Sequence, residues 1–134
     1  MTALASCPCG RLDAKKRDVA YVTCCGRFVD HFATTPALDA ELLMRSRYSA
    51  FTLERADYLL ATWHSSTRPV SLDFDAGAKW LGLEVREHKF TGDDAAEVEF
   101  VARYRVAGAA VRLHERSRFV SEDGRWFYVD GDQR

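Results

Sequence analysis

All four cysteines of this chain lie within its first 25 residues, as the two close pairs Cys7-Pro8-Cys9-Gly10 and Cys24-Cys25-Gly26. A tetrahedral zinc ion takes four thiolates, and two pairs on either side of a loop can supply them. The first six residues have neither the charged region nor the apolar stretch of a signal peptide. We therefore expect a cytoplasmic location, where thiols stay reduced and clustered cysteines indicate a metal site rather than disulfides.

Energetics also favour zinc, because about 28 residues with so little apolar content cannot bury a useful core. Zinc binding to four thiolates can supply folding free energy on the order of 10 kcal/mol instead. With Cys7, Cys9, Cys24 and Cys25 as ligands the site has no open position, so we expect structural zinc. His31 is a less favoured substitute ligand. A redox dithiol and an incidental cluster remain the alternatives, although the thioredoxin-like C-x-x-C pattern is absent.

The cysteine pattern resembles the SEC-C zinc motif, known from the C-terminal tail of the preprotein translocase motor SecA. The spacer from Gly10 to Thr23 has 14 residues, more than the compact form of the motif. Residues 1–28 carry five basic side chains against two acidic ones. The basic residues are Arg11, Lys15, Lys16, Arg17 and Arg27. A locally basic loop is either a solvated surface or a docking site for an acidic partner or RNA.

Length and composition predict one ordinary globular domain, with 134 residues of which 47% are hydrophobic and 12% aromatic. The net charge of −1 gives no whole-chain case for binding nucleic acid or an anionic membrane. The sequence has no apolar run of the roughly 18 to 20 residues that a membrane span needs.

Residues 38 to 63 have helical periodicity, with apolar side chains such as Leu38, Leu42 and Phe51 recurring at three- and four-residue steps. Asp39 is placed to cap this first helix. A second helix is expected over about 54–63, and a short third one over 73–80, ending at Trp80.

From Leu81 onward the period becomes two, which indicates strands near 81–86, 97–106, 111–119 and 125–130. Gly- and Asp-containing turns separate them, at Thr91–Asp94, Ala107–Ala109 and Glu122–Gly124. Helices followed by an antiparallel four-strand meander make an α+β domain. A strongly curved sheet would form a cystatin-like cone with the helices as its lid. We expect a cysteine module over 1–28, a connector, and the cone over 37–134.

Several blocks of the chain resemble the YchJ family of bacterial proteins. They are Leu43–Phe51, Ala56–Leu59, Thr62–His64, Trp80–Leu83, Glu115–Phe119 and Trp126–Gly131. The resemblance implies a nuclear-transport-factor-2-like fold behind an N-terminal SEC-C module. It implies little about mechanism, because the family has no established activity.

Glu115 needs an explanation, since it shares a strand face with the apolar Val111, Leu113 and Phe119. Burying it unpaired would cost several kcal/mol, so it should have a polar partner. The candidates for that partner are Arg45, Arg47 and His64. The cluster is either a structural ion pair or a ligand-anchoring or acid–base group in a pocket. Further pocket candidates are Tyr48, Trp63, Trp126 and Tyr128.

The opposite face of the sheet is expected to be a mixed solvated surface. Its basic residues are Arg103, Arg105, Arg112, His114, Arg116 and Arg118. Its acidic residues are Glu84, Glu87, Glu97 and Glu99, which can neutralise them across the strands.

Three functions follow from these features. The leading hypothesis is a zinc-containing binding or adaptor protein that docks a protein partner through its cysteine module. The alternative is a small-molecule-binding protein or enzyme that uses the cone; no catalytic residue is assigned, and whether the protein is an enzyme stays open. RNA binding is the weaker third hypothesis. A cone packed solid would exclude the pocket hypothesis, whereas a cavity of some hundreds of Å³ with Glu115 in its wall would favour it.

Overall fold

A computed structural model describes residues 5–74 and 77–134 of the chain. A short 3₁₀ helix η1 (Tyr21–Thr23) and helix α1 (Gly26–Val29) follow the first cysteine pair. Helices α2 (Ala40–Thr52) and α3 (Ala56–Ala61) come next. Four long strands complete the fold, β1 (Lys79–Gly92), β2 (Ala95–Val106), β3 (Ala109–Glu122) and β4 (Arg125–Gln133).

The four strands form one antiparallel sheet in the order β1-β2-β3-β4, which confirms the predicted α+β class and meander. Two of its hairpin turns place paired residues at positive φ, Ala107 with Gly108 and Asp123 with Gly124. This is the type of turn that two-residue hairpins prefer, because its twist matches that of the strands. The predicted turns are therefore confirmed, and the strands extend beyond their predicted ends.

Irregularities in β1 change which side chains face inward. The pairing of β1 with β2 shifts register between Trp80 and Gly82 and at two further points. A bulge of this kind bends a strand and interrupts its alternation. As a result Leu81, expected on the same face as Leu83 and Val85, is 47% exposed. Trp80 and Leu83 pack against the core instead.

The helices begin and end close to their predicted positions. Asp39 caps α2 as expected, since its carboxylate accepts a hydrogen bond of 2.8 Å from the backbone N–H of Leu42. The expected helix over 73–80 is wrong throughout the described residues, and Lys79 and Trp80 begin β1 instead. Residues 73, 74, 77 and 78 are not helical, and 75 and 76 lie outside the described residues.

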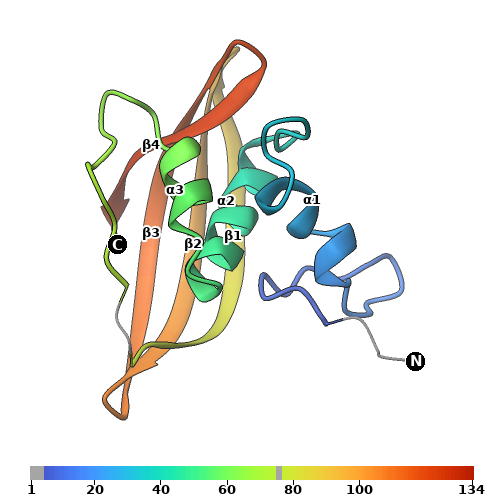
Figure 1. The fold of residues 1–134 in the computed structure, drawn as a ribbon, viewed down its shortest axis with the longest axis vertical. Helices are drawn as coiled ribbons and strands as arrows, with labels where there is room; N and C mark the ends of the chain where they lie inside the picture. The colour runs from blue at the N-terminus through green and yellow to red at the C-terminus, as the bar shows by residue number, and fades with distance from the viewer. Residues whose placement is uncertain (1–4, 75–76) are drawn as a thin grey trace.

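Helices α2 and α3 lie against one face of the curved sheet, and the N-terminal segment packs beside α2, away from β3 and β4 (Figure 1). One cluster of buried residues includes the four cysteines, α2, α3 and the inward side chains of β2. Helix α2 therefore has neighbours on two sides, the cysteines and the sheet. Within the described ranges, none of the helices has the length and apolar character that crossing a membrane requires.

Candidate metal centre and sheet cavity

Backbone hydrogen bonds bring the two cysteine pairs together. The N–H of Cys7 donates to Val19 O over 2.8 Å, and that of Tyr21 donates to Ala5 O over 2.9 Å. These bonds hold the residues before the first pair beside those that lead into the second. Gly10, at a φ of 73°, adopts the left-handed conformation that turns the chain after Cys9.

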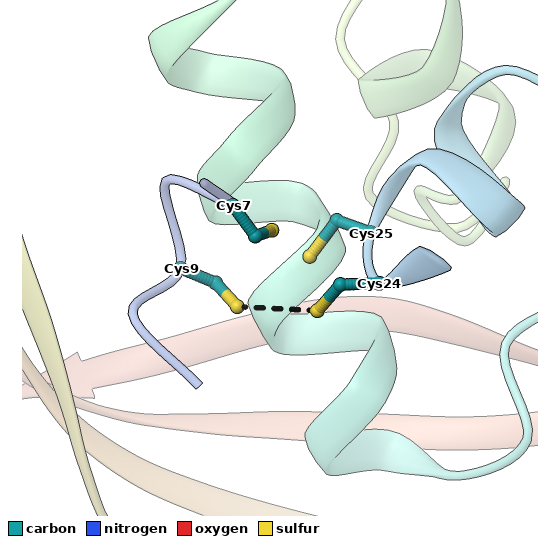
Figure 2. A group of neighbouring side chains, drawn as sticks. All are labelled: Cys7, Cys9, Cys24 and Cys25. Atoms are coloured by element: carbon teal, nitrogen blue, oxygen red, sulfur yellow. Dashed lines mark hydrogen bonds between the residues drawn. The ribbon is translucent and has the colours of Figure 1, made fainter. Parts of the chain in front are cut away.

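The four sulfur atoms converge on a common centre (Figure 2). All four lie within 4.8 Å of one another, and Cys9 Sγ is 3.7 Å from Cys24 Sγ. Tetrahedral zinc with bonds of about 2.3 Å would separate its sulfurs by about 3.8 Å. The cysteines are free thiols and buried, so their arrangement fits a closed metal site.

Two arginines contact Cys24, and hydrogen bonds to its sulfur favour the thiolate form. Arg11 Nε donates to Cys24 Sγ over 3.3 Å, and Arg27 Nε donates to Cys24 O over 2.9 Å. Hydrogen bonds from the Cys25, Cys7 and Cys9 thiols, and from Arg11, lower the pKa of the Cys24 thiol. Arg11 and Arg27 were expected on a basic surface, but in the structure both contact Cys24.

The cysteine segment, residues 5–29, is fastened to the helices by polar contacts. Cys7 Sγ lies 3.6 Å from Ser49 Oγ on α2. Arg45 Nη1 donates to Cys9 O over 3.3 Å. At its end, Arg55 Nη2 donates to Val29 O over 3.4 Å, and Arg55 pairs with the next residue, Asp30, over 2.6 Å. The cysteine segment is therefore part of the protein's core rather than a free appendage.

A cavity of about 360 Å³ lies between α2 and the inner face of the sheet. Its wall is mainly aromatic, and Trp80 packs against Tyr48, Phe51 and Tyr104 with ring centroids 4.8 to 6.0 Å apart. Further aromatic residues in the wall are Trp63, Phe74, Phe100, Phe119 and Tyr128. The cone is therefore hollow, which was the condition that favours the pocket hypothesis.

Arg47 is a cation in this wall that is only 5% exposed. Its Nη1 donates to Leu59 O and to Thr62 Oγ1, both over 2.8 Å and both uncharged. The guanidinium carbon lies 5.0 Å from the ring centroid of Trp63 and 4.6 Å from that of Tyr128. Burial lowers the pKa of Arg47 to about 10, so the side chain still carries its charge at neutral pH.

The end of α3 is joined to β4, which sets these rings beside Arg47. Residues Trp63 and Tyr128 form a backbone bridge, and their rings meet edge to face with centroids 5.1 Å apart. The N–H of Tyr128 donates to Thr62 O over 2.8 Å. The indole N–H of Trp63 is buried with no acceptor among the described residues.

Glu115 lies in the same cavity wall and has hydroxyl partners rather than the expected arginine or histidine. Its Oε1 accepts hydrogen bonds from Ser117 Oγ at 2.8 Å and from Tyr128 Oη at 3.4 Å. Burial and the charge of Glu115 raise the pKa of Tyr128 to about 12, so Tyr128 stays a donor. The absent Cβ of Gly131 leaves room for the carboxylate, because a Cβ there would lie 2.1 Å from Oε1.

The structure brings five of the eight predicted pocket residues to the cavity and places three elsewhere. Arg47, Tyr48, Trp63, Glu115 and Tyr128 line it. Arg45 pairs with Glu41 over 3.0 Å and contacts the cysteine segment. His64 bonds to Ser66 and Glu122, and Trp126 lies farther along the same face of β4 as Tyr128, where it packs near Phe90. Arg45 and Arg47 are two residues apart on α2, so their side chains lie on opposite faces of the helix. Arg45 therefore points away from the cavity that Arg47 lines.

Sequence reasoning missed Trp80, Phe51 and Gly131 as parts of this site. Trp80 was assigned to a helix end, and only its true position on β1 directs it inward. Gly131 gave no local signal, because its role depends on the strand register that places it opposite Ser117.

The outer sheet face carries the expected mixed charges, and those of His114, Arg116 and Arg118 are paired. Arg116 contacts Glu87, Glu97 and Glu99. His114 bonds to Glu99 over 3.0 Å, and Arg118 pairs with Asp130 and Asp132. This pairing supports the solvated surface that the sequence predicted.

Two solved structures share this architecture. The solution structure of a SEC-C motif containing protein from Rhodopseudomonas palustris superimposes with a TM-score of 0.78 at 32% identity, over 96% of this chain and 98% of that one. A crystal structure of a SEC-C motif containing protein from Psychrobacter arcticus gives 0.78 at 31% identity, over 93% of this chain and 80% of that one.

Sequence relatives are closer still. A UPF0225 protein of Polaromonas sp. strain JS666 is 67% identical over 131 residues, covering 97% of this chain and 94% of its own. A UPF0225 protein of Bordetella pertussis is 56% identical over 131 residues, with the same two shares. The family model for the middle NTF2-like domain of YchJ matches residues 39–131. With its fold, its cysteine cluster and these relatives in agreement, the chain belongs to the YchJ (UPF0225) family of SEC-C motif containing proteins.

Proposed function

We propose that this protein binds a small molecule in the cavity between α2 and the sheet. The observation that carries the proposal is a hollow of about 360 Å³ whose aromatic wall contains one buried cation, Arg47, and, facing it, the carboxylate of Glu115. Ligand sites combine a largely apolar concave wall with a few polar groups that fix orientation, and their volumes begin at about 300 Å³. If this region only stabilised the fold, we would expect side chains to fill the space, because protein interiors are close-packed.

The cysteines have a supporting role in this proposal. Zinc bound by Cys7, Cys9, Cys24 and Cys25 would stabilise the segment that packs against α2, and a closed four-thiolate site leaves no position for a substrate. Residues 1–28 then form the metal module and residues 37–134 the ligand-binding domain. A cytoplasmic location, where thiols stay reduced, is part of the same proposal.

A cavity-filling variant tests the proposal. Ala102 is buried in the cavity wall, so Ala102→Leu places extra carbon atoms in the space that a ligand needs. Ala110→Leu adds the same atoms at an exposed position of β3 and is the matched control. We expect a small-molecule library, screened by amide NMR, to shift signals of cavity residues in the wild type and the control. Equal responses from Ala102→Leu, or none from any protein, would contradict the proposal.

Protein docking through the cysteine segment is a second candidate. Leu12 and Val22 on this segment are 49% and 54% exposed, and Lys15 and Lys16 of the same segment are exposed as well. Apolar side chains flanked by uncompensated positive charge suit an acidic protein partner. The basic surface is smaller than the sequence suggested, since Arg17 pairs with Asp13 over 3.1 Å and Arg11 faces Cys24.

Charge-reversal variants distinguish docking through the cysteine segment from ligand binding in the cavity. An acidic partner identified by co-purification should lose affinity for Lys15→Glu/Lys16→Glu and keep it for Arg103→Glu/Arg105→Glu on the exposed end of β2. Equal affinities for the two variants would remove the docking candidate. An RNA ligand, the weaker alternative, would instead show a steep salt dependence of binding.

A further inference from the structure

Arg47 has hydrogen-bond donors that the protein leaves unused. A guanidinium carries five N–H groups. Only Nη1 has partners among the described residues, and both are uncharged. Glu115 acts on Arg47 through its charge alone, without a direct hydrogen bond. A buried cation whose Nε and Nη2 have no acceptor in the described protein is suited to an anionic group that enters the cavity.

Glu115 presents the opposite charge in the same cavity. Both of its hydrogen bonds within the described residues go to Oε1, so Oε2 is left to accept from a ligand. Tyr128 touches both groups, with its ring beside Arg47 and its hydroxyl bonded to Glu115. The cavity therefore holds a cation and an anion that are close to one another and yet not paired.

The charges along the wall argue against a ligand of a single sign. Two exposed carboxylates, Glu54 and Asp73, line the cavity in addition to Glu115, whereas Arg47 is its one basic residue within the described wall. A simple anion would meet repulsion from three carboxylates. A simple cation would leave the buried Arg47 uncompensated.

We infer that the ligand is a small zwitterion, an amino acid or a close analogue with an apolar side chain, whose carboxylate binds Arg47 and whose ammonium binds Glu115. This inference rests on the proposed function of the cavity. The apolar side chain would pack among the aromatic residues around Trp80, which form the larger part of the wall.

Three probes with one shared body test the inference. L-phenylalanine carries both charges, 3-phenylpropanoate lacks the ammonium, and 2-phenylethylamine lacks the carboxylate. Titration calorimetry at pH 7 should show L-phenylalanine binding at least about tenfold more tightly than either of the others, because each charge-assisted contact contributes on the order of a factor of ten.

Variants assign each charge to its residue. Glu115→Gln should weaken L-phenylalanine about tenfold and leave 3-phenylpropanoate unchanged or tighter. Arg47→Gln should weaken L-phenylalanine and leave 2-phenylethylamine unchanged. Arg47→Lys is the second variant if the glutamine form does not fold, since it keeps the charge and loses the planar fork. Arg112→Gln, an exposed arginine on β3, should change none of the three affinities.

The outcomes separate the inference from the proposed function. The inference of a zwitterionic ligand is wrong if L-phenylalanine binds no more tightly than a singly charged probe. It is also wrong if Glu115→Gln weakens all three probes equally. In either case the cavity remains a binding site. The same holds if none of the three binds while other compounds shift the signals of cavity residues. If no compound binds in the cavity at all, both the inference and the proposed function fail.

Discussion

The cysteine segment and the cavity both bury polar atoms, and they differ in how those atoms are satisfied. In the cysteine segment Arg11 and Arg27 donate to Cys24, and the four sulfurs are close enough for one metal ion to join them. In the cavity wall Arg47 and Glu115 keep unused hydrogen-bonding capacity. A closed polar cluster stabilises a fold, whereas an open one is available to a ligand. The contrast supports our proposal that the first region stabilises the fold and the second binds a ligand.

Removing the zinc that we propose should have the largest effect. If the four cysteines hold zinc, the Cys9→Ser variant, or a strong chelator, should remove a stabilisation on the order of 10 kcal/mol, comparable to the whole stability of a domain. Because the cysteines share one buried cluster with α2, we expect α2 to loosen as well. Thermal melts followed by circular dichroism, with zinc content measured by mass spectrometry, provide the check. An unchanged melting temperature after chelation would contradict the stabilising role proposed for the cysteine segment.

Crowding the start of α1 should have the next largest effect. A Cβ at Gly26 would lie 2.8 Å from the backbone oxygen of Tyr21, which cannot move aside easily. Gly26→Ala should therefore lower the free energy of unfolding by about 1–3 kcal/mol, as overpacking does. Gly82→Ala is the control, because nothing lies within 4 Å of a Cβ at that position. Urea unfolding that gives equal values for the two variants would contradict the prediction.

Crowding the cavity wall should instead affect binding. A Cβ at Gly131 would meet the carboxylate of Glu115, the flexible end of a side chain, which can shift. We expect Gly131→Ala to cost less than about 1 kcal/mol of stability and to weaken a cavity ligand about tenfold. Calorimetric titration beside urea unfolding measures both effects. A large loss of stability with unchanged binding would reverse the roles given to the two regions.

Acid should produce the smallest effect, on the ion pairs outside both regions. Hydrogen bonds from His114 and Arg116 lower the pKa of Glu99 below its ordinary 4.5. A hydrogen bond from Arg55 lowers that of Asp57 below 3.8. Their stabilisation is present above these ordinary values and is lost as pH falls through the lower folded values. The difference in unfolding free energy between wild type and Glu99→Gln should therefore shrink between pH 5 and pH 3, and a constant difference would contradict this.

Local patterns were sufficient to predict most of the fold. The two-residue period of β2, the Gly- and Asp-containing turns and the cap at Asp39 depend on neighbours in the chain, and each is confirmed. Trp80 and Leu81 were misplaced because a register shift in β1 depends on pairing with β2, which local periodicity does not encode.

The residues of the candidate site also fall into those that local sequence patterns predicted and those that they did not. The four cysteines could be named from spacing, since a metal site brings ligands together across a short loop. Five of the eight pocket residues line the cavity; among them Glu115 was found from strand parity, and Arg47 as a candidate partner for its carboxylate. Arg45 was misassigned, because a helical arginine can serve either of the two surfaces that α2 touches, and the sequence does not show which.

By itself the sequence determined the thiol cluster, the order of helices and strands, and the presence of a carboxylate among apolar neighbours at Glu115. These features follow from composition and short-range periodicity. Only the tertiary structure decided that the cone is hollow, that Arg47 lies in its wall without a bonded carboxylate, and that the cysteines pack on the far side of the same helix. Those outcomes depend on how the sheet curves against α2, and curvature arises from register shifts between strands distant in the chain.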